Sequence, residues 1–103
     1  MTTPTEPTEA VARGAALLDE KMPGWESRID VQRLNITSYK DSMLGQLYGR
    51  YNFGLDSLKL NYLGDAPLGF NGTIANMDAL TEAWRRLIAE RRFAAQRESI
   101  LSV

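Results

Sequence analysis

The sequence predicts a mainly α-helical protein: a compact bundle of four to five helices, with a loop rich in glycine and aromatic residues and a long C-terminal helix. The long helix is expected from Asn76 to about Gln96, because this run contains no Gly or Pro and is rich in Ala, Leu, Arg and Glu. Its apolar residues recur at spacings of three and four, which places them on one stripe: Met77, Leu80, Trp84, Leu87 and Ile88. The rest of the chain must cover this stripe.

Length and composition are those of one globular domain. The chain has 103 residues, of which 44% are hydrophobic and 24% are charged, as is ordinary for a folded domain. We expect a disordered leader over residues 1–7, a single helical domain over 8–98 and a tail over 99–103. No apolar signal-peptide core and no apolar run of membrane-spanning length is found, so we expect a cytoplasmic protein without a membrane segment.

The first predicted helix runs from about Thr8, a suitable N-cap, to Lys21. Gly14 weakens this helix slightly, but it would let another element approach closely. The buried face of the helix is expected to consist of residues three or four apart: Val11, Ala15 and Leu18, with Leu17 at the margin.

Pro23 and Gly24 end the first helix. Trp25 follows directly, and together with Ile29 it predicts a short helical turn whose indole is buried over the first helix. Asp30 can then cap a second short turn over residues 31–34. The imperfect alternation of apolar residues in this region leaves a strand as the less favoured alternative.

The next predicted helix runs from Tyr39 to about Tyr48, capped by Thr37 or Ser38 and ended by Gly49. Its apolar residues are again three and four apart: Tyr39, Met43, Leu44, Leu47 and Tyr48. We expect the C-terminal helix to pack on this helix and on the first one through Met77, Leu80, Trp84 and Leu87.

The region between Gly45 and Gly72 contains six of the eight glycines and five of the nine aromatic residues. Within it we expect one short helix, begun near Phe53, that carries Leu55, Leu58 and Leu60. An ordered loop is expected over residues 61–73. The dipeptide Asn71-Gly72 favours a tight turn, and hence a hairpin between residues 68–70 and 73–75.

The aromatic residues of this region have two interpretations. They can fill the core beside Trp25 and Trp84, which is favoured because a small domain needs large rings to build a core. Alternatively, they form a platform for a partner or for nucleic-acid bases, with Arg50 adding charge. The residues concerned are Tyr48, Tyr51, Phe53, Tyr62 and Phe70.

The composition argues against catalysis. The chain has no Cys and no His, which excludes disulfides, thiol nucleophiles, ordinary zinc sites and the usual proton shuttle of neutral pH. A serine nucleophile such as Ser38, Ser42 or Ser57 would lack its usual base. No phosphate-binding glycine motif and no carboxylate pair at a suitable spacing is present. We therefore expect neither an enzyme nor a protein that holds a metal or cofactor.

Four phrases stand out in order along the chain: Ala15–Glu20; Pro23–Trp25 with Arg28–Asp30 and Leu34; Leu44–Gly49; and Leu80–Ile88. Together they resemble a group of small uncharacterised proteins encoded by actinobacteria and their phages. The resemblance covers most of residues 13–92 and implies a phage or bacterial origin, but it implies no activity for any residue. Relatives often carry Cys around the segment that is Tyr39–Met43 here.

The outward face of the C-terminal helix carries the best functional signal. With Trp84 as reference and about 100° per residue, Phe93 falls opposite the apolar stripe, and Arg86 and Arg97 lie roughly 20–40° from Phe93. An exposed ring beside arginines is typical of an interface hot spot. The plainer interpretation is one exposed aromatic residue at a fraying helix end. Arg91 falls within the apolar stripe, which predicts that the body of the domain ends before this residue.

The charge distribution keeps a second class of function open. Residues 1–84 carry seven basic and eleven acidic side chains, whereas residues 85–103 carry five Arg and two Glu. A weak nucleic-acid-binding protein would use Arg85, Arg86, Arg92 and Arg97, but the basic excess is small for this class. We therefore predict a non-enzymatic, phage-encoded binding protein that engages a host or phage protein, and can dimerise, through its C-terminal helix. The predicted contact residues are Arg86, Phe93 and Arg97.

Overall fold

The predicted mainly α-helical fold is confirmed. The computed structural model describes residues 7–38, 40–60, 68–71 and 77–101, and no strand occurs among them. Four α-helices and one 3₁₀-helix follow each other along this part of the chain: α1 (Pro7–Lys21), η1 (Trp25–Arg28), α2 (Met43–Tyr48), α3 (Tyr51–Ser57) and α4 (Met77–Leu101).

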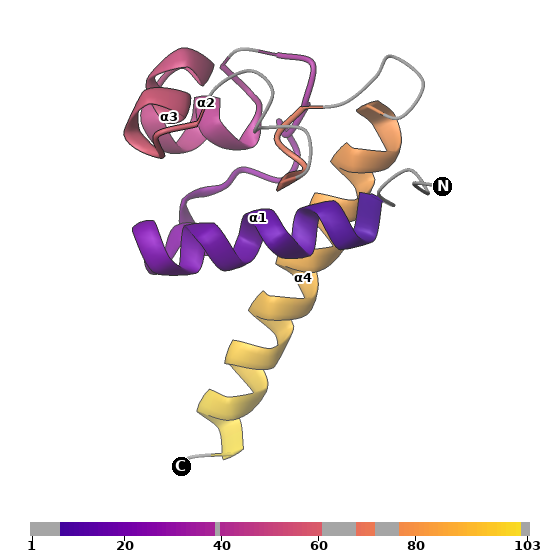
Figure 1. Cartoon of the computed structure of the whole chain (residues 1–103). Helices are drawn as coiled ribbons and strands as arrows, with labels where there is room; N and C mark the ends of the chain where they lie inside the picture. The colour runs from indigo at the N-terminus through magenta and orange to yellow at the C-terminus, as the bar shows by residue number, and fades with distance from the viewer. Residues whose placement is uncertain (1–6, 39, 61–67, 72–76, 102–103) are drawn as a thin grey trace, which may run out of the picture.

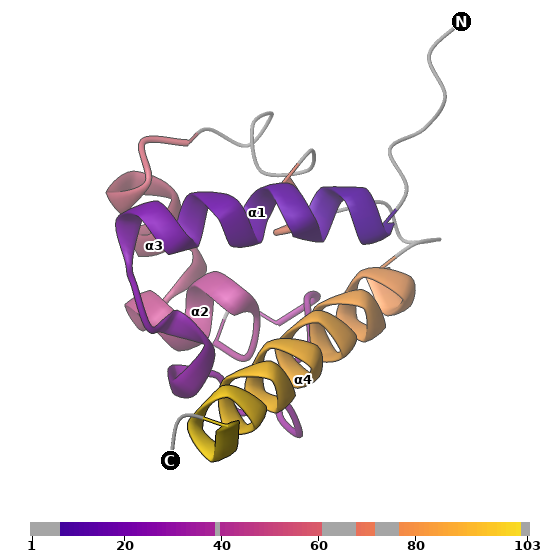
Figure 2. The same ribbon diagram turned by 90° about the horizontal axis from the view of Figure 1, so that it is seen from below.

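The helices form two groups joined by the segment after η1. Helix α1 crosses α4 and packs against it, while α2 and α3 pack against each other (Figure 1). Helix η1 contacts both α4 and α2, so it lies where the two groups meet. The C-terminal end of α4 extends away from the other helices in Figure 1, and the view from below in Figure 2 shows α1 and α4 at an angle to each other.

A cluster of three rings forms the centre of the core. Trp25, Phe70 and Trp84 are all fully buried. The two indoles meet edge to face at 5.7 Å between ring centroids, and Phe70 stacks on Trp84 at the same distance. Both indole N–H groups have acceptors: Trp84 donates to the carbonyl of Gly69 at 2.7 Å, and Trp25 donates to Asp19 at 2.9 Å. Because each buried donor is satisfied, the rings can be buried without a polar penalty.

The close approach that the sequence predicted at Gly14 is confirmed. A Cβ atom at this position would lie 2.1 Å from the carbonyl oxygen of Leu68 and 2.9 Å from the ring of Trp84. Only glycine therefore lets α1 lie this close to the ring cluster. The predicted buried face of α1 is also confirmed, since Val11, Ala15 and Leu18 are buried and Leu17 is half-buried; Ala10 and Gly14 are buried beside them.

Several predicted helix ends were wrong. Helix α1 begins at Pro7, so Thr8 lies in the first turn and is not the N-cap. Proline is well suited to a first helical position because its missing N–H would be unpaired there anyway. Helix α4 continues to Leu101 instead of ending near Gln96, and its expected first residue, Asn76, lies outside the described residues.

The middle helix is shorter than predicted, because two serines compete as caps. The Ser42 hydroxyl accepts the backbone N–H of Gly45 at 3.0 Å and begins α2 at Met43. The Ser38 hydroxyl instead accepts the N–H groups of Lys40 and Asp41, which makes a turn before the helix. The predicted stop is confirmed, with Gly49 at φ 90°. Tyr39 lies outside the described residues.

Most of the described aromatic residues between Gly45 and Gly72 belong to the core, which is the interpretation that the sequence favoured. Phe70 and Tyr51 are buried and Tyr48 is half-buried, whereas the side chain of Phe53 is 55% exposed. Tyr62 lies outside the described residues, as does most of the predicted loop over 61–73. Helix α3 begins at Tyr51, two residues earlier than expected. Of the predicted hairpin, residues 68–70 form a turn and not a strand, and residues 73–75 are not described.

The predicted packing of α4 was half right. Its main contacts are with α1 and η1, whereas α2 packs mainly on α3, so the predicted contact with residues 39–48 is at most minor. The segment after η1 takes that place against α4. Thr81 accepts the backbone N–H of Ile36 through its hydroxyl at 3.2 Å, and Gln46 of α2 holds the other side of the segment through the backbone of Asp30.

Candidate protein-interaction surface on helix α4

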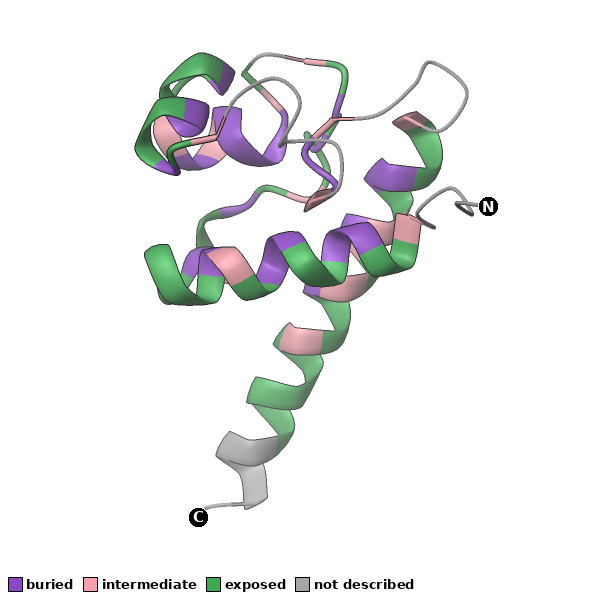
Figure 3. Ribbon diagram, in the orientation of Figure 1, coloured by how far each residue is buried: buried purple, intermediate pink, exposed green. Residues whose placement is uncertain are grey.

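Helix α4 has a buried face and an outer face, and both are continuous over several turns. Leu80, Trp84 and Ile88 are buried on the inner side, as the sequence predicted. From residue 92 to residue 97 every side chain is exposed, and Figure 3 shows that burial ends where α4 passes beyond α1. The outer face is therefore accessible both along the body of the domain and along the projecting end.

The prediction that the body of the domain ends before Arg91 was wrong. Arg91 lies in the apolar stripe, as predicted, but it is packed against the body, which therefore extends past this residue. Its guanidinium pairs with Asp19 at 2.6 Å and lies over the ring of Trp25 at 5.6 Å. The hydrogen bond from Arg91 lowers the pKa of Asp19, although partial burial opposes this shift. The same contact raises the pKa of Arg91, so the pair is ionised at neutral pH.

Arg92 and Arg85 bind backbone carbonyls of the segment around η1. Arg92 donates to the carbonyls of Glu26 and Ile29, both at 2.6 Å. Arg85 donates to the carbonyls of Val31 at 2.9 Å and Leu34 at 3.0 Å, and it also pairs with a carboxylate on its own helix. These two arginines therefore anchor irregular backbone that has no helical or sheet partner.

Arg86 and Arg97, by contrast, make no hydrogen bond or ion pair with any residue that the structure describes. Both side chains are exposed, and Phe93 between them has an exposed fraction of 65%. Helical geometry places Arg86 about 20° and Arg97 about 40° from Phe93 around the axis. The structure thus brings the three predicted partner-binding residues onto one outward face.

The arginines predicted for nucleic-acid binding are divided by the fold. Arg85 and Arg92 are engaged with the chain itself, while Arg86 and Arg97 are available. Two available arginines provide little positive charge for binding the phosphate backbone of a nucleic acid. Sequence reasoning did not foresee the carbonyl contacts, because they join residues more than fifty positions apart and leave no periodic signal.

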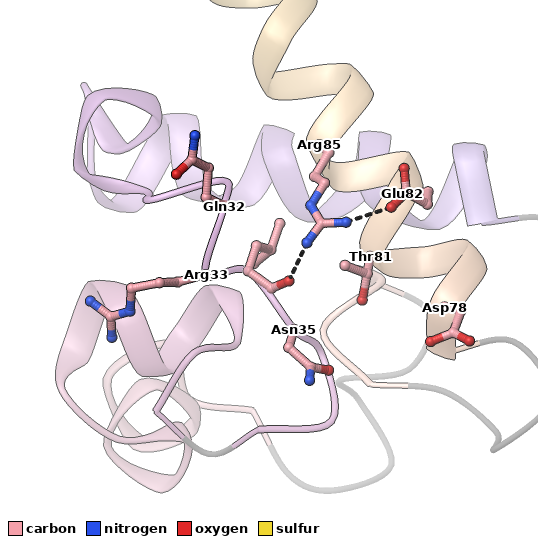
Figure 4. Close-up of a pocket in the computed structure, with 8 residues that line it drawn as sticks. Gln32, Arg33, Asn35, Asp78, Thr81, Glu82 and Arg85 are labelled. Atoms are coloured by element: carbon pink, nitrogen blue, oxygen red, sulfur yellow. Dashed lines mark hydrogen bonds and ion pairs between the residues drawn. The ribbon is translucent and has the colours of Figure 1, made fainter.

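The described surface also contains shallow polar pockets. The pocket in Figure 4 has a volume of about 320 Å³ and lies between the segment after η1 and the start of α4. Figure 4 shows Arg85 crossing it, with its guanidinium held by Leu34 and Glu82. Asp78 and Glu82 are two carboxylates on one helix turn, and the described residues contain no group of three or more acidic side chains that could hold a metal ion. The pocket is open and its main cation is already paired, which makes it a weaker candidate than the outer face of α4.

A second exposed aromatic residue lies on the other helix group. Phe53 of α3 is 55% exposed, and the guanidinium of Arg50 lies 5.9 Å from its ring. Of the aromatic platform considered as the alternative interpretation, the structure supports only this pair of Arg50 and Phe53 among the described residues. Helix α3, which carries Phe53, lies apart from the end of α4 (Figure 1), so Phe53 provides a matched comparison for Phe93.

Comparisons do not relate the chain to known proteins. Neither the protein-family models, nor the curated proteins, nor the solved structures contain a match to this sequence or fold. The resemblance to actinobacterial and phage proteins therefore stays a prediction. Over the described part of the chain, no helix combines the length and the apolar character needed to cross a membrane.

Proposed function

We propose that this protein is a non-enzymatic binding protein that contacts another protein through the outer face of α4. The observation that carries the proposal is the exposure of Phe93 between two unengaged arginines, on a helix that extends beyond the domain. Aromatic and arginine side chains dominate the binding energy of protein interfaces. Arg86, Phe93 and Arg97 are the proposed contact residues.

The rigidity of the helix base supports this assignment. Arg91 and Arg92 tie the middle of α4 to α1 and η1 through side-chain and backbone acceptors. The direction in which the outer turns leave the domain is therefore set before a partner binds. A preorganised surface loses less conformational entropy on association, which favours binding.

The resemblance noted for the sequence makes a host or phage protein in the cytoplasm the first partner to test. The experiment is a pull-down from nuclease-treated actinobacterial lysate with three baits: wild type, Phe93→Glu and the control Phe53→Glu. Both variants place a charge where an exposed ring stood, so both are expected to keep the wild-type helical content and melting temperature.

We expect wild type and Phe53→Glu to retain the same protein and Phe93→Glu to lose it. The retained protein is then purified and titrated against each bait. The measured dissociation constants, and not capture from the lysate, decide the test. Equal affinity of wild type and Phe93→Glu would contradict the proposal. Binding that collapses between low and physiological salt, and that requires nucleic acid, would favour the arginine-based alternative instead.

A further inference from the structure

The outer face of α4 has a charge pattern that complements itself. Viewed down the helix from Phe93, one flank carries Arg86, Glu90 and Arg97, about 20°, 60° and 40° away. Ala89 and Gln96 lie on the other flank, about 40° and 60° away. All six side chains are exposed. Neither Glu90 nor Arg97 forms an ion pair with a residue of the described chain, so two opposite charges stand unpaired beside an exposed ring.

We infer that this face pairs with the same face of a second copy of the chain, with the two α4 helices antiparallel and Phe93 at the two-fold axis. The inference rests on the proposed function, in that it takes the outer face as an interface, and it names one occupant. An interface with two-fold symmetry must be complementary to itself, which few surface patches are.

The antiparallel arrangement follows from the positions of the charges along the helix. Glu90 lies three residues before Phe93 and Arg97 lies four residues after it. A two-fold axis at Phe93 therefore brings Glu90 of one copy level with Arg97 of the other to within one residue, about 1.5 Å of rise. Such an axis, perpendicular to both helices, also keeps the charged flanks of the two copies on the same side, so two ion pairs form.

A parallel arrangement lacks this complementarity. Rotation about an axis along the helices places the charged flank of one copy against the flank of Ala89 and Gln96 in the other. Glu90 and Arg97 would then face no charge. In the antiparallel pair, the small Ala89 side chain lies opposite Gln96 and lets the helices approach closely, while the two Phe93 rings meet at the centre.

The size of the face sets the strength of the pairing. From Arg86 to Arg97 the face is about 17 Å long, which is roughly three helical turns. This length gives a contact smaller than a standard protein interface of about 1,600 Å². The pair is therefore a reversible dimer whose population depends on protein concentration, and it can dissociate to present Phe93 to another partner.

The first arm of the test is sedimentation equilibrium over a range of concentrations. Wild type is expected to show concentration-dependent dimers, and Phe93→Glu is expected to stay monomeric. Glu90→Arg and Arg97→Glu should each weaken the dimer at least about tenfold, because each places like charges together twice per dimer. The double variant Glu90→Arg/Arg97→Glu should restore the wild-type constant. Arg13→Glu, on the exposed side of a helix that packs against the opposite face of α4, is the charge-reversal control.

The second arm tests the orientation. The chain has no Cys, so introduced thiols report cleanly. A mixture of Ala89→Cys and Gln96→Cys proteins should form a disulfide-linked pair on mild oxidation, whereas Ala89→Cys alone should cross-link far less. Failure of the mixture to cross-link, or failure of the charge-swapped variant to recover dimerisation, would overturn the inference.

The outcomes separate the two proposals. A wild-type protein that is monomeric at every concentration, yet loses its purified partner on Phe93→Glu substitution, overturns self-pairing and leaves the proposed function in place. A protein that is monomeric and binds its partner equally well with Phe93→Glu overturns both. Dimerisation with the predicted charge rescue supports the inference whether or not a further partner is found.

Discussion

Arg85 and Arg86 are neighbours in the sequence, yet they belong to different parts of the molecule. The guanidinium of Arg85 is held by the carbonyls of Val31 and Leu34, whereas Arg86 points outward and makes no hydrogen bond or ion pair with a described residue. The difference is one step of about 100° around the helix. Arg91 and Arg97, six positions apart, repeat the contrast, since Arg91 is paired with Asp19 and Arg97 is exposed.

This contrast shows that a count of charges along a helix does not give the charge available to a partner. Residues 85–97 contain five arginines, but Arg85, Arg91 and Arg92 are engaged with acceptors of the same chain. Arg85 and Arg92 are engaged because the segment around η1 is irregular and leaves carbonyl groups that need donors, whereas Arg91 pairs with the carboxylate of Asp19. The inner face of α4 thus stabilises the fold, and the outer face is left exposed.

The inner face should be the most sensitive to substitution. Trp84→Ala removes a fully buried ring that contacts both Trp25 and Phe70, and it leaves the Gly69 carbonyl without its donor. The free energy of unfolding should fall by about 3–5 kcal/mol, which can unfold a domain of this size. Urea denaturation followed by circular dichroism measures this loss. An unchanged midpoint would contradict the assigned core.

The neighbouring arginines allow the sharpest test of the contrast. Arg85→Ala removes charged hydrogen bonds to two backbone carbonyls and should lower the free energy of unfolding by about 1–3 kcal/mol. Arg86→Ala should change it by less than about 0.5 kcal/mol, because the side chain is exposed and unpaired. Thermal denaturation of the two variants side by side measures the difference. Equal effects would mean that the contacts of Arg85 contribute nothing to stability.

The ion pair between Asp19 and Arg91 should make a smaller contribution to the free energy of unfolding, and this contribution should depend on pH. Asp19 has a pKa below its ordinary value of 3.8, chiefly because Arg91 donates to its carboxylate. A lowered pKa in the folded state stabilises the protein above pH 3.8, and the stabilisation is lost as the pH falls below that value. Since the Asp19 side chain is 45% exposed, solvent screening keeps this contribution below about 1 kcal/mol.

Asp19→Asn should therefore cost less than about 1 kcal/mol at pH 7 and should lose less stability than wild type when the pH is lowered through this range. Asp56→Asn on α3, where the exposed side chain has no described partner, is the control and should follow the wild-type curve. Urea denaturation at a series of pH values measures all three proteins. Parallel curves for wild type and Asp19→Asn would show that the pair with Arg91 does not contribute.

Local pattern predicted the helices, and long-range contacts account for most of what it missed. The spacing of Leu80, Trp84 and Ile88 was sufficient to predict the inner face of α4, and the same geometry placed Phe93 outward. The start of α2 was missed because Ser38 and Ser42 are both good caps, and only the folded chain shows which one begins the helix. Such local competition cannot be resolved from one sequence.

The contacts of Arg85 and Arg92 could not be predicted for a different reason. Their acceptors are carbonyl groups, which every residue carries, so no residue type in the segment from Glu26 to Leu34 marks them. The missed partner of α4 has the same origin, because the segment that displaces α2 is irregular and has no periodic apolar pattern. The candidate surface was predictable because it depends on one helix alone.

A small effect is expected at the exposed ring of the outer face. Phe93→Ala replaces a ring that is 65% exposed and lies beyond the core, so the free energy of unfolding should change by less than about 0.5 kcal/mol. Trp84→Ala, nine positions earlier on the same helix, should lower the free energy of unfolding several times more. The comparison uses melting temperatures of both alanine variants under identical conditions, at a concentration low enough to keep wild type monomeric. A loss above 1 kcal/mol for the monomeric Phe93→Ala protein would mean that the ring packs against its own domain, and the outer face of α4 would then belong to the fold and not to an interface.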